Sequence, residues 1–317
     1  MDSKRKPIGV KMLISLHGVL NSKEKNLFLK LWGQVFSPFL STQTIRSSTG
    51  NGPASRYVFG ATSGALATSL TGLTWNNQTS GFGTDTIFAA AASPTLYVIG
   101  GSAGKIATST DGLSWTLRTS GFGTSPILGL TYHAPSGQYI AVGGDGKLST
   151  SLNGITWNIR TSSFGLTFIN DVHSDGVRVT AVGDSGKLAT SSTGTTWVQA
   201  TSGFGLTRIS AVASANGTLV AVGSAGKLAT STDGVSWTQR SSSFGSIAIN
   251  DVSGRSGSEF VAVGDSGLLA ISSNGVSWSQ YPSSFLSSES IQTIFINESV
   301  AVAGGSNGKI ARSQREV

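Results

Sequence analysis

Few residues of this chain have the type and spacing that acid–base, metal or nucleophilic chemistry requires. The 317 residues include no Cys, which excludes thiolate metal sites and Cys catalysis. The three histidines, His17, His133 and His173, lack the spacing of metal ligands, and we interpret them as surface or turn residues. No predicted helix follows the GxG runs, so they do not predict a phosphate-binding loop. The sequence therefore predicts no metal and no cofactor.

Three arginines and a small set of glutamates are the remaining candidates for catalysis. Arg118, Arg160 and Arg240 occupy the same position in different sequence repeats, so symmetry would spread them apart rather than gather them around one ligand. Glycoside hydrolysis needs two carboxyl groups within roughly 5–10 Å of each other. After residue 30 the glutamates are Glu259, Glu289, Glu298 and Glu316, and nothing in their spacing suggests such a pair. We predict no catalytic residues and a protein that is not an enzyme.

The net charge of +7 is concentrated near the N-terminus. Residues 1–30 carry seven basic and two acidic side chains, whereas the other residues carry 15 basic and 13 acidic ones. A nucleic-acid-binding domain needs its basic groups clustered on the folded surface. We therefore expect no nucleic acid on the main body of the protein. Its 42 Gly and 12% charged residues instead favour short strands joined by tight turns.

An internal repeat of about 40 residues organises the chain. The segment GKIATSTDGLSWTLRTSGFG begins at Gly104 and recurs in close copies from Gly146, Gly186 and Gly226. Looser copies begin at Gly64 and Gly267. This period suits either a helical repeat or a four-stranded propeller blade. Abundant Val, Ile, Thr and Trp between glycines favour the blade.

Each repeat is predicted to contain four strands. In the copy around Trp115 the expected strands are residues 86–92 (A), 96–101 (B), 105–110 (C) and 113–119 (D), with a Gly-rich turn between B and C. The B and C patterns each occur seven times, but the last copy ends before a D strand. Residues 30–45 align with residues 276–294, so we expect residues 29–36 to supply the missing outer strand beside residues 308–313. The repeat tryptophans, expected to be mostly buried, are Trp32, Trp75, Trp115, Trp157, Trp197, Trp237 and Trp278.

A short motif recurs at the predicted turn between strands C and D. Residues 109–115 and 231–237 both have the sequence S-T-D-G-x-S-W. This motif resembles the Asp-box of BNR-like propellers, a Ser-x-Asp-x-Gly-x-Thr-Trp turn, although one residue between Asp and Gly is missing here. Other copies replace the Asp with Thr71, Asn153, Thr193 and Asn274. The resemblance implies an all-β, seven-bladed β-propeller with four-stranded blades, similar to sialidase-like, photosystem II assembly factor-like and phage structural proteins. In that family the box is a folding element, so the resemblance implies no chemistry.

Two repeated features could form a binding face on the propeller. Lysines follow the B–C turns and aspartates lie within them, and these turns share one face with the D–A loops. This candidate binding face comprises Lys105, Lys147, Lys187, Lys227, Lys309, Asp145, Asp184 and Asp265. It could hold a glycan, a phosphate or an acidic partner, although solubility and edge protection are the favoured interpretation of the lysines. The D–A loop phenylalanines could form a sugar-binding ring, but packing between blades is favoured; they are Phe82, Phe122, Phe164, Phe204, Phe244 and Phe285.

The propeller, residues 28–317, does not account for residues 1–27. This extension combines basic and apolar side chains, and the predicted anchor residues are Lys4, Arg5, Lys6, Met12, Leu13, Ile14 and Leu16. Lys11 and His17 interrupt its apolar run and no small-residue cleavage pattern follows, so a signal peptide is disfavoured. No apolar run reaches the ~18–20 residues of a membrane span. Packing along the propeller edge and docking on another protein both remain open.

These observations favour a non-enzymatic structural or interaction protein. Our leading hypothesis is a phage virion component of the tail, neck or fibre region, in which the extension contacts other virion or assembly proteins and the propeller presents a binding surface. The alternative is a lectin-like propeller that binds a surface glycan, located in the bacterial cytoplasm or at the cell surface. A sialidase-like glycan hydrolase is the third hypothesis.

Overall fold

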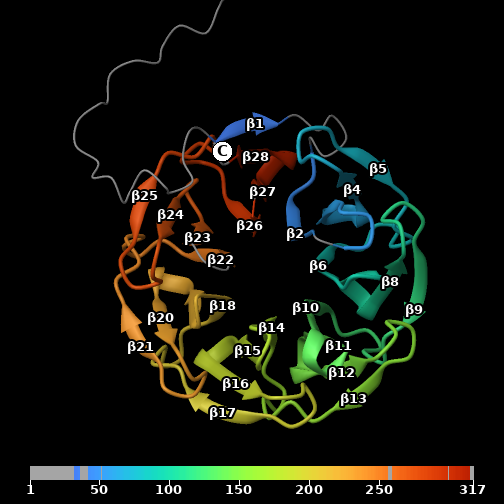
Figure 1. Ribbon diagram of the computed structural model, residues 1–317, viewed down its shortest axis with the longest axis horizontal. Coiled ribbons are helices and arrows are strands. Elements are labelled where there is room, and N and C mark those ends of the chain that lie inside the picture. The colour runs from blue at the N-terminus through green and yellow to red at the C-terminus, as the bar shows by residue number, and fades with distance from the viewer. Residues whose placement is uncertain (1–31, 36–41, 51, 256–258, 299, 315–317) are drawn as a thin grey trace, which may run out of the picture.

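The computed structural model describes residues 32–35, 42–50, 52–255, 259–298 and 300–314. These residues form seven four-stranded antiparallel sheets, arranged as blades around a central channel (Figure 1). The predicted all-β, seven-bladed propeller is therefore confirmed. The part of the chain described here contains no helix that is long and apolar enough to cross a membrane. All seven predicted anchor residues, between Lys4 and Leu16, lie outside the described residues, and their role stays a prediction.

Six blades are built from consecutive strands, with strand A nearest the channel and strand D at the perimeter (Figure 1). Blade 1 comprises β2 (Ile45–Thr49), β3 (Tyr57–Ala61), β4 (Leu66–Ser69) and β5 (Asn76–Gln78). Blade 2 comprises β6 (Ile87–Ala92), β7 (Tyr97–Gly101), β8 (Lys105–Ser109) and β9 (Thr116–Thr119). Blade 3 comprises β10 (Ile127–His133), β11 (Gln138–Gly143), β12 (Leu148–Ser151) and β13 (Asn158–Arg160). Blade 4 comprises β14 (Ile169–Ser174), β15 (Val179–Gly183), β16 (Lys187–Ser191) and β17 (Val198–Thr201). Blade 5 comprises β18 (Ile209–Ala215), β19 (Thr218–Gly223), β20 (Leu228–Ser231) and β21 (Thr238–Arg240). Blade 6 comprises β22 (Ile249–Arg255), β23 (Glu259–Gly264), β24 (Leu269–Ser272) and β25 (Ser279–Tyr281).

The seventh blade combines strands from both ends of the sequence. Its inner strands are β26 (Ile291–Ile296), β27 (Val300–Gly305) and β28 (Ile310–Gln314), and its outer strand is β1 (Gly33–Val35). Strands β1 and β28 pair antiparallel, with Gly33 opposite Arg312 and Val35 opposite Ile310. The neighbouring Trp32 is 6% exposed and belongs to the apolar core around β26 and β27. The described part of the segment thus lies where the repeat alignment places it.

Six of the seven B–C connections are short 3-10 turns rather than simple two-residue hairpins. They are η2 (Thr62–Gly64), η3 (Ser102–Gly104), η5 (Gly144–Gly146), η6 (Asp184–Gly186), η7 (Ser224–Gly226) and η8 (Ser306–Gly308), and η4 (Ala134–Ser136) joins β10 to β11. In η7, Gly226 has a φ of +63°, and a Cβ there would lie 2.0 Å from the carbonyl oxygen of Gly245. Glycine is required because the following D–A loop approaches this turn too closely for any side chain.

The apolar core lies between adjacent blades. Phe82, for example, belongs to one core cluster with Val58 and Leu66 of blade 1 and Ile87 and Ile99 of blade 2. The six D–A phenylalanines of the candidate sugar-binding ring are at most 7% exposed, which confirms the packing interpretation. Full burial removes their rings from any sugar-binding surface.

The tryptophans are less uniform than the sequence suggests. Trp32, Trp75 and Trp197 are buried, whereas Trp115, Trp157, Trp237 and Trp278 are half-buried. In the six copies from Trp75 to Trp278 the indole N–H donates to the carbonyl of the glycine three residues earlier. The predicted D strand of blade 2 began at residue 113, but β9 begins at Thr116. Trp115 therefore belongs to the C–D turn at the perimeter, where one side of the ring remains open to solvent.

Backbone N–H groups hold these C–D turns by donating to one serine and to one Asp, Asn or Thr side chain. In blade 2 the Asp111 carboxylate accepts the backbone N–H groups of Leu113 and Ser114 at 2.8 and 2.9 Å, and Ser109 accepts that of Gly112. These bonds hold the pKa of Asp111 below its usual value. Asn153 accepts the two equivalent N–H groups in blade 3, so an amide can replace the carboxylate.

Candidate binding face and central channel

The D–A loops form one face of the ring, and four of them are fixed on two sides. On one side, a loop serine donates to the carbonyl of the B–C turn glycine of its own blade, as Ser202 does to Gly186 at 2.6 Å. On the other side, the lysine after the next B–C turn donates to the carbonyl of the loop phenylalanine. This second bond is 2.8 Å for Lys105 and 2.7 Å for Lys147. The loops therefore connect neighbouring blades through polar as well as apolar contacts.

Lysines of the candidate binding face thus contribute to the propeller's own packing. Lys187 and Lys227 bond to Phe164 and Phe204 in the same manner, at 2.8 and 2.9 Å. Lys309 differs, because its ammonium group pairs with Glu289 at 2.7 Å and lies over the ring of Phe285. All five lysines lie on the predicted face, but each has an intramolecular acceptor. Whether this face binds a ligand stays a prediction.

The three turn aspartates of the candidate binding face also have intramolecular partners. Asp145 accepts a hydrogen bond from Ser125 in the preceding D–A loop. Asp184 and Asp265 accept bonds from the side-chain amides of Asn170 and Asn250, each at 2.9 Å. These contacts link the B–C turns to the D–A loop or to the innermost strand of the same blade. The aspartates therefore hold this face in shape.

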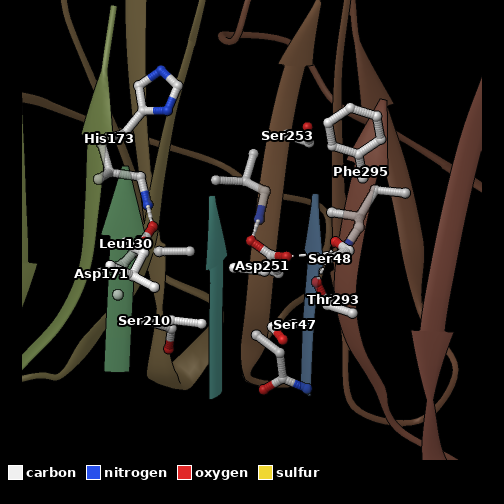
Figure 2. Close-up of a pocket in the computed structure, with 18 of the residues that line it drawn as sticks. Ser47, Ser48, Leu130, Asp171, His173, Ser210, Asp251, Ser253, Thr293 and Phe295 are labelled. Carbon is white, nitrogen blue, oxygen red and sulfur yellow. Dashed lines mark hydrogen bonds between the residues drawn. The ribbon is translucent and has the colours of Figure 1, made fainter. Parts of the chain in front are cut away.

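The innermost strands line a central channel of about 340 Å³, which Figure 2 shows from the side. Every A strand has a register shift near its start, for example between Ile169 and Asp171 in β14. Such a β-bulge changes the direction in which the next side chain points. In blades 4 and 6 the bulge places Asp171 and Asp251 in the channel lining, where Figure 2 shows them at similar heights.

Each channel aspartate connects two blades through backbone N–H groups. Asp171 accepts the N–H of Val172 at 2.8 Å and that of Val212, in the next blade, at 2.9 Å. Asp251 accepts the N–H of Val252 at 2.7 Å and that of Ile294 at 2.8 Å. Burial raises the pKa of Asp171 to about 6. Burial, together with the charge of Asp171, raises that of Asp251 to about 7. The protein surrounds both groups, although each has one side open to the channel.

The asparagines at the two bulges provide a second connection between the same blades. The Asn170 amide donates to the carbonyl of Ile209, and that of Asn250 donates to the carbonyl of Ile291. An Asn-Asp pair therefore uses both the carbonyl and the N–H groups of the next innermost strand. Sequence reasoning missed these residues, although the tetrapeptide I-N-D-V occurs at both 169–172 and 249–252. That signal could have identified them.

The prediction that the histidines are surface or turn residues is wrong for two of them, and His17 lies outside the described residues. His133 is 0% exposed at the end of β10, where its ring contacts Ser174 at 2.8 Å and the carbonyl of Ser192 at 3.2 Å. His173 lines the channel and contacts Ser214 at 2.8 Å. Burial lowers the pKa of His173 to about 4, which favours its neutral form. The sequence did not reveal that these positions lie on innermost strands.

The arginines and glutamates considered for catalysis have separate structural partners. Arg118, Arg160 and Arg240 lie at equivalent positions of three blades, and each donates to a threonine of its own blade at 3.0 Å. Glu259 forms a buried ion pair with Arg255 at 3.3 Å. Among the residues that the structure describes, no three His, Asp or Glu side chains lie close enough together to hold a metal ion.

A family model matches almost half of the chain. Residues 172–309 match the DUF6242 beta propeller domain. The match begins in β14 and ends just before β28, so it spans most of blades 4 to 7. No curated protein matches the chain in sequence.

Solved structures share the fold at low sequence identity. YCF48 from Cyanidioschyzon merolae is 17% identical, with 89% of this chain and 98% of that chain covered and a TM-score of 0.70. YCF48 bound to the D1 peptide is 16% identical, with coverages of 92% and 97% and a TM-score of 0.73. A catalytically inactive virginiamycin B lyase from Staphylococcus aureus, with quinupristin, is 9% identical, with coverages of 90% and 99% and a TM-score of 0.76. These likenesses show the fold alone, and the same fold serves both binding and catalysis.

The channel aspartates are arranged for architecture more than for proton transfer. Both oxygens of each carboxylate already accept a backbone N–H, so neither group presents an oxygen free of protein partners to a substrate. A general base needs to reach the proton that it removes. The geometry therefore favours a rigid ring whose outer surfaces are available for binding.

Proposed function

We propose that this protein is a non-enzymatic binding platform that works as a component of a phage particle, in the tail, neck or fibre region. The observation that carries the binding role is the exposure of Leu166 and Leu206, at 85% and 89%. They occupy the same position of two consecutive D–A loops, on the face that carries the channel mouth. They are the two most exposed large apolar side chains among the described residues, and such side chains in neighbouring loops are typical of a protein contact.

Two further observations support this proposal. The solved structure of YCF48 with the D1 peptide indicates that a propeller of this shape can bind a polypeptide. The C–D turns, which resemble Asp-boxes, form a folding element in our interpretation, so they leave the D–A face available for partners. The basic and apolar composition of residues 1–27 suits a separate anchor to an assembly partner.

The virion role is tested by mass spectrometry of particles assembled from the genome that encodes this chain. We expect the protein in purified particles at a fixed copy ratio. Replacing the apolar anchor residues with serine or glutamine in the full chain (Met12→Gln, Leu13→Ser, Ile14→Ser and Leu16→Ser) should abolish incorporation. The thermal unfolding of the propeller should remain unchanged in this variant.

Two results would overturn the proposal. Absence of the protein from purified particles would refute the virion role. Specific binding on a glycan array without cleavage would favour the lectin-like alternative, and cleavage of an arrayed glycan would favour the hydrolase.

A further inference from the structure

Blades 4 and 5 repeat a combination of lysine and leucine on the D–A face. Lys187 donates to the carbonyl of Phe164, and Leu166 lies two residues after that phenylalanine. Lys227 donates to Phe204, and Leu206 follows at the same distance in sequence. An ammonium group is therefore bound to the same short loop that exposes a leucine, and this arrangement occurs twice in adjacent blades. We name these four residues the Lys–Leu pairs.

The charge around the Lys–Leu pairs differs from that of blades 2 and 7. In blades 2 and 7 the equivalent lysines form ion pairs, Lys105 with Asp85 and Lys309 with Glu289, both at 2.7 Å. Among the described residues, no carboxylate lies within 4.0 Å of the ammonium group of Lys187 or Lys227. This sector of the face therefore has an excess of positive charge.

One more cation adds to this sector. Arg208 lies two residues after Leu206 and its side chain is 55% exposed. It pairs with Asp184 at 3.6 Å, a long and exposed contact that leaves the guanidinium accessible. Phe168, which is 40% exposed, precedes β14 on the loop that carries Leu166. Cationic and apolar side chains thus alternate across the two loops.

A groove lies beside Lys187, one member of the Lys–Leu pairs. It has a volume of about 480 Å³ and is lined by Lys187 of blade 4 and by Gly203 and Gly205, which belong to the loop that exposes Leu206. The remaining lining comes from Leu188 and from the end of β17. A chain that occupied this groove could contact Lys187 and Gly205, the residue that precedes Leu206 in its loop.

We infer that the Lys–Leu pairs bind an acidic segment of a partner protein that also carries apolar side chains. The inference rests on the proposed binding function and names the chemistry of the partner. Carboxylates would neutralise Lys187 and Lys227 and would compete with Asp184 for the exposed guanidinium of Arg208. Apolar side chains would cover Leu166 and Leu206 and remove them from water. A glycan or a nucleic acid satisfies the cations but leaves the leucines exposed, so a polypeptide fits better.

The test uses a fluorescent synthetic peptide in which Glu and Leu alternate, with fluorescence anisotropy as the readout and the full-length protein as receptor. We expect saturable binding that weakens with salt. Replacing both leucines (Leu166→Ser with Leu206→Ser) or both lysines (Lys187→Gln with Lys227→Gln) should weaken binding about tenfold. Peptides with Lys in place of Glu, or Ser in place of Leu, should bind the wild-type protein no more tightly than the original peptide binds the double variants.

Matched controls separate the binding effect from effects on folding. Leu152→Ser removes a leucine that is 74% exposed in the C–D turn of blade 3, on the opposite face. Arg118→Gln removes a cation from the outer strand of blade 2, outside blades 4 and 5. Both controls should retain wild-type affinity. If the double lysine variant unfolds early, Lys187→Arg with Lys227→Arg restores the charge and should bind normally.

The outcomes distinguish this inference from the proposed function. Equal affinities of the wild-type protein and the double variants, or equal losses in the controls, would overturn the docking site. If the protein is found in particles but the double leucine variant is incorporated normally, the platform remains and the Lys–Leu pairs are not its contact. If the protein is absent from particles but the peptide binds as expected, the docking site stands and the virion role fails.

Discussion

The carboxylate of Asp251 should make the stability of the propeller depend on pH. Its pKa is raised from 3.8 to about 7, first by burial and then by the charge of Asp171, so the folded state favours the protonated form. An unfolded chain ionises this group near pH 4, whereas the folded chain does so near pH 7. The free energy of unfolding therefore decreases as the pH rises between these values and levels off above them.

The size of the effect follows from the same values. A rise in pKa from 3.8 to about 7 corresponds to about 4 kcal/mol, since one pKa step is worth about 1.36 kcal/mol. One side of the carboxylate faces the channel, where water screens part of this penalty. The range from pH 5 to pH 8 also covers only part of the titration, so we expect about 2 kcal/mol over it.

The substitution Asp251→Asn tests this reasoning, because an amide stays neutral at every pH. The variant loses one backbone hydrogen bond, since its nitrogen cannot accept the N–H of Val252 or Ile294. That loss costs about 1 kcal/mol and does not depend on pH. Urea unfolding between pH 5 and pH 8 should show the stability of the variant, relative to wild type, increasing by about 2 kcal/mol. Asp171→Asn should lower the pKa of Asp251 by removing the neighbouring charge.

Asp233→Asn is the matched control. Backbone N–H groups of the C–D turn lower the pKa of Asp233, so this carboxylate contributes stability that is lost only as the pH falls below about 4. Its variant should differ from wild type by the same amount from pH 5 to pH 8. A constant difference for Asp251→Asn over this range would show that Asp251 ionises as it does in water, and our account of the channel would be wrong.

Three further predictions concern packing and backbone conformation. Trp75 is buried and stacks on Phe59 with ring centroids 4.3 Å apart, so Trp75→Ala should lower the free energy of unfolding, measured by calorimetry, by about 3–5 kcal/mol. Trp237→Ala should lower it less because Trp237 is half-buried, and equal losses would contradict this difference in burial. Gly226→Ala should destabilise the protein far more than Gly245→Ala in urea titrations. Both glycines have positive φ, but a Cβ at Gly226 would lie 2.0 Å from a carbonyl oxygen, whereas one at Gly245 would meet nothing within 4 Å. Arg255→Met should lower the free energy of unfolding by about 3–5 kcal/mol, because it removes the cation paired with the carboxylate of Glu259, which is 1% exposed. A variant as stable as wild type would argue against a charged pair.

The repeat made the ring predictable, because the regular spacing of tryptophans and glycines indicates one blade for each repeat. The alignment of Trp32 with Trp278 also indicated which segment completes the last blade. Burial of the D–A phenylalanines followed from their fixed position beside glycine. These features depend on contacts that recur in every repeat, so one sequence contains several copies of the same signal.

Features that break the repeat were not predictable in the same way. Asp171 and Asp251 come together in the channel through two blades that are about 80 residues apart, and the intervening blade has Ala211 at the corresponding position. Their raised pKa values depend on the closed ring, which local patterns do not describe. The sequence does not show that the lysines have intramolecular partners, but Lys105 and its equivalents donate to the D–A loop that precedes their own blade. Only the three-dimensional closeness of turn and loop reveals that bond.

The pairing of β1 with β28 has a consequence for how the protein is made. The two strands are far apart in sequence, so during synthesis β1 emerges from the ribosome long before its partner. Blades 1 to 6 can each form as soon as their own residues are available, because their strands are consecutive. The unpaired edge of blade 7 persists until β28 has been synthesised. Ring closure is therefore a late, long-range step, and chains released prematurely would expose edges that can pair with each other.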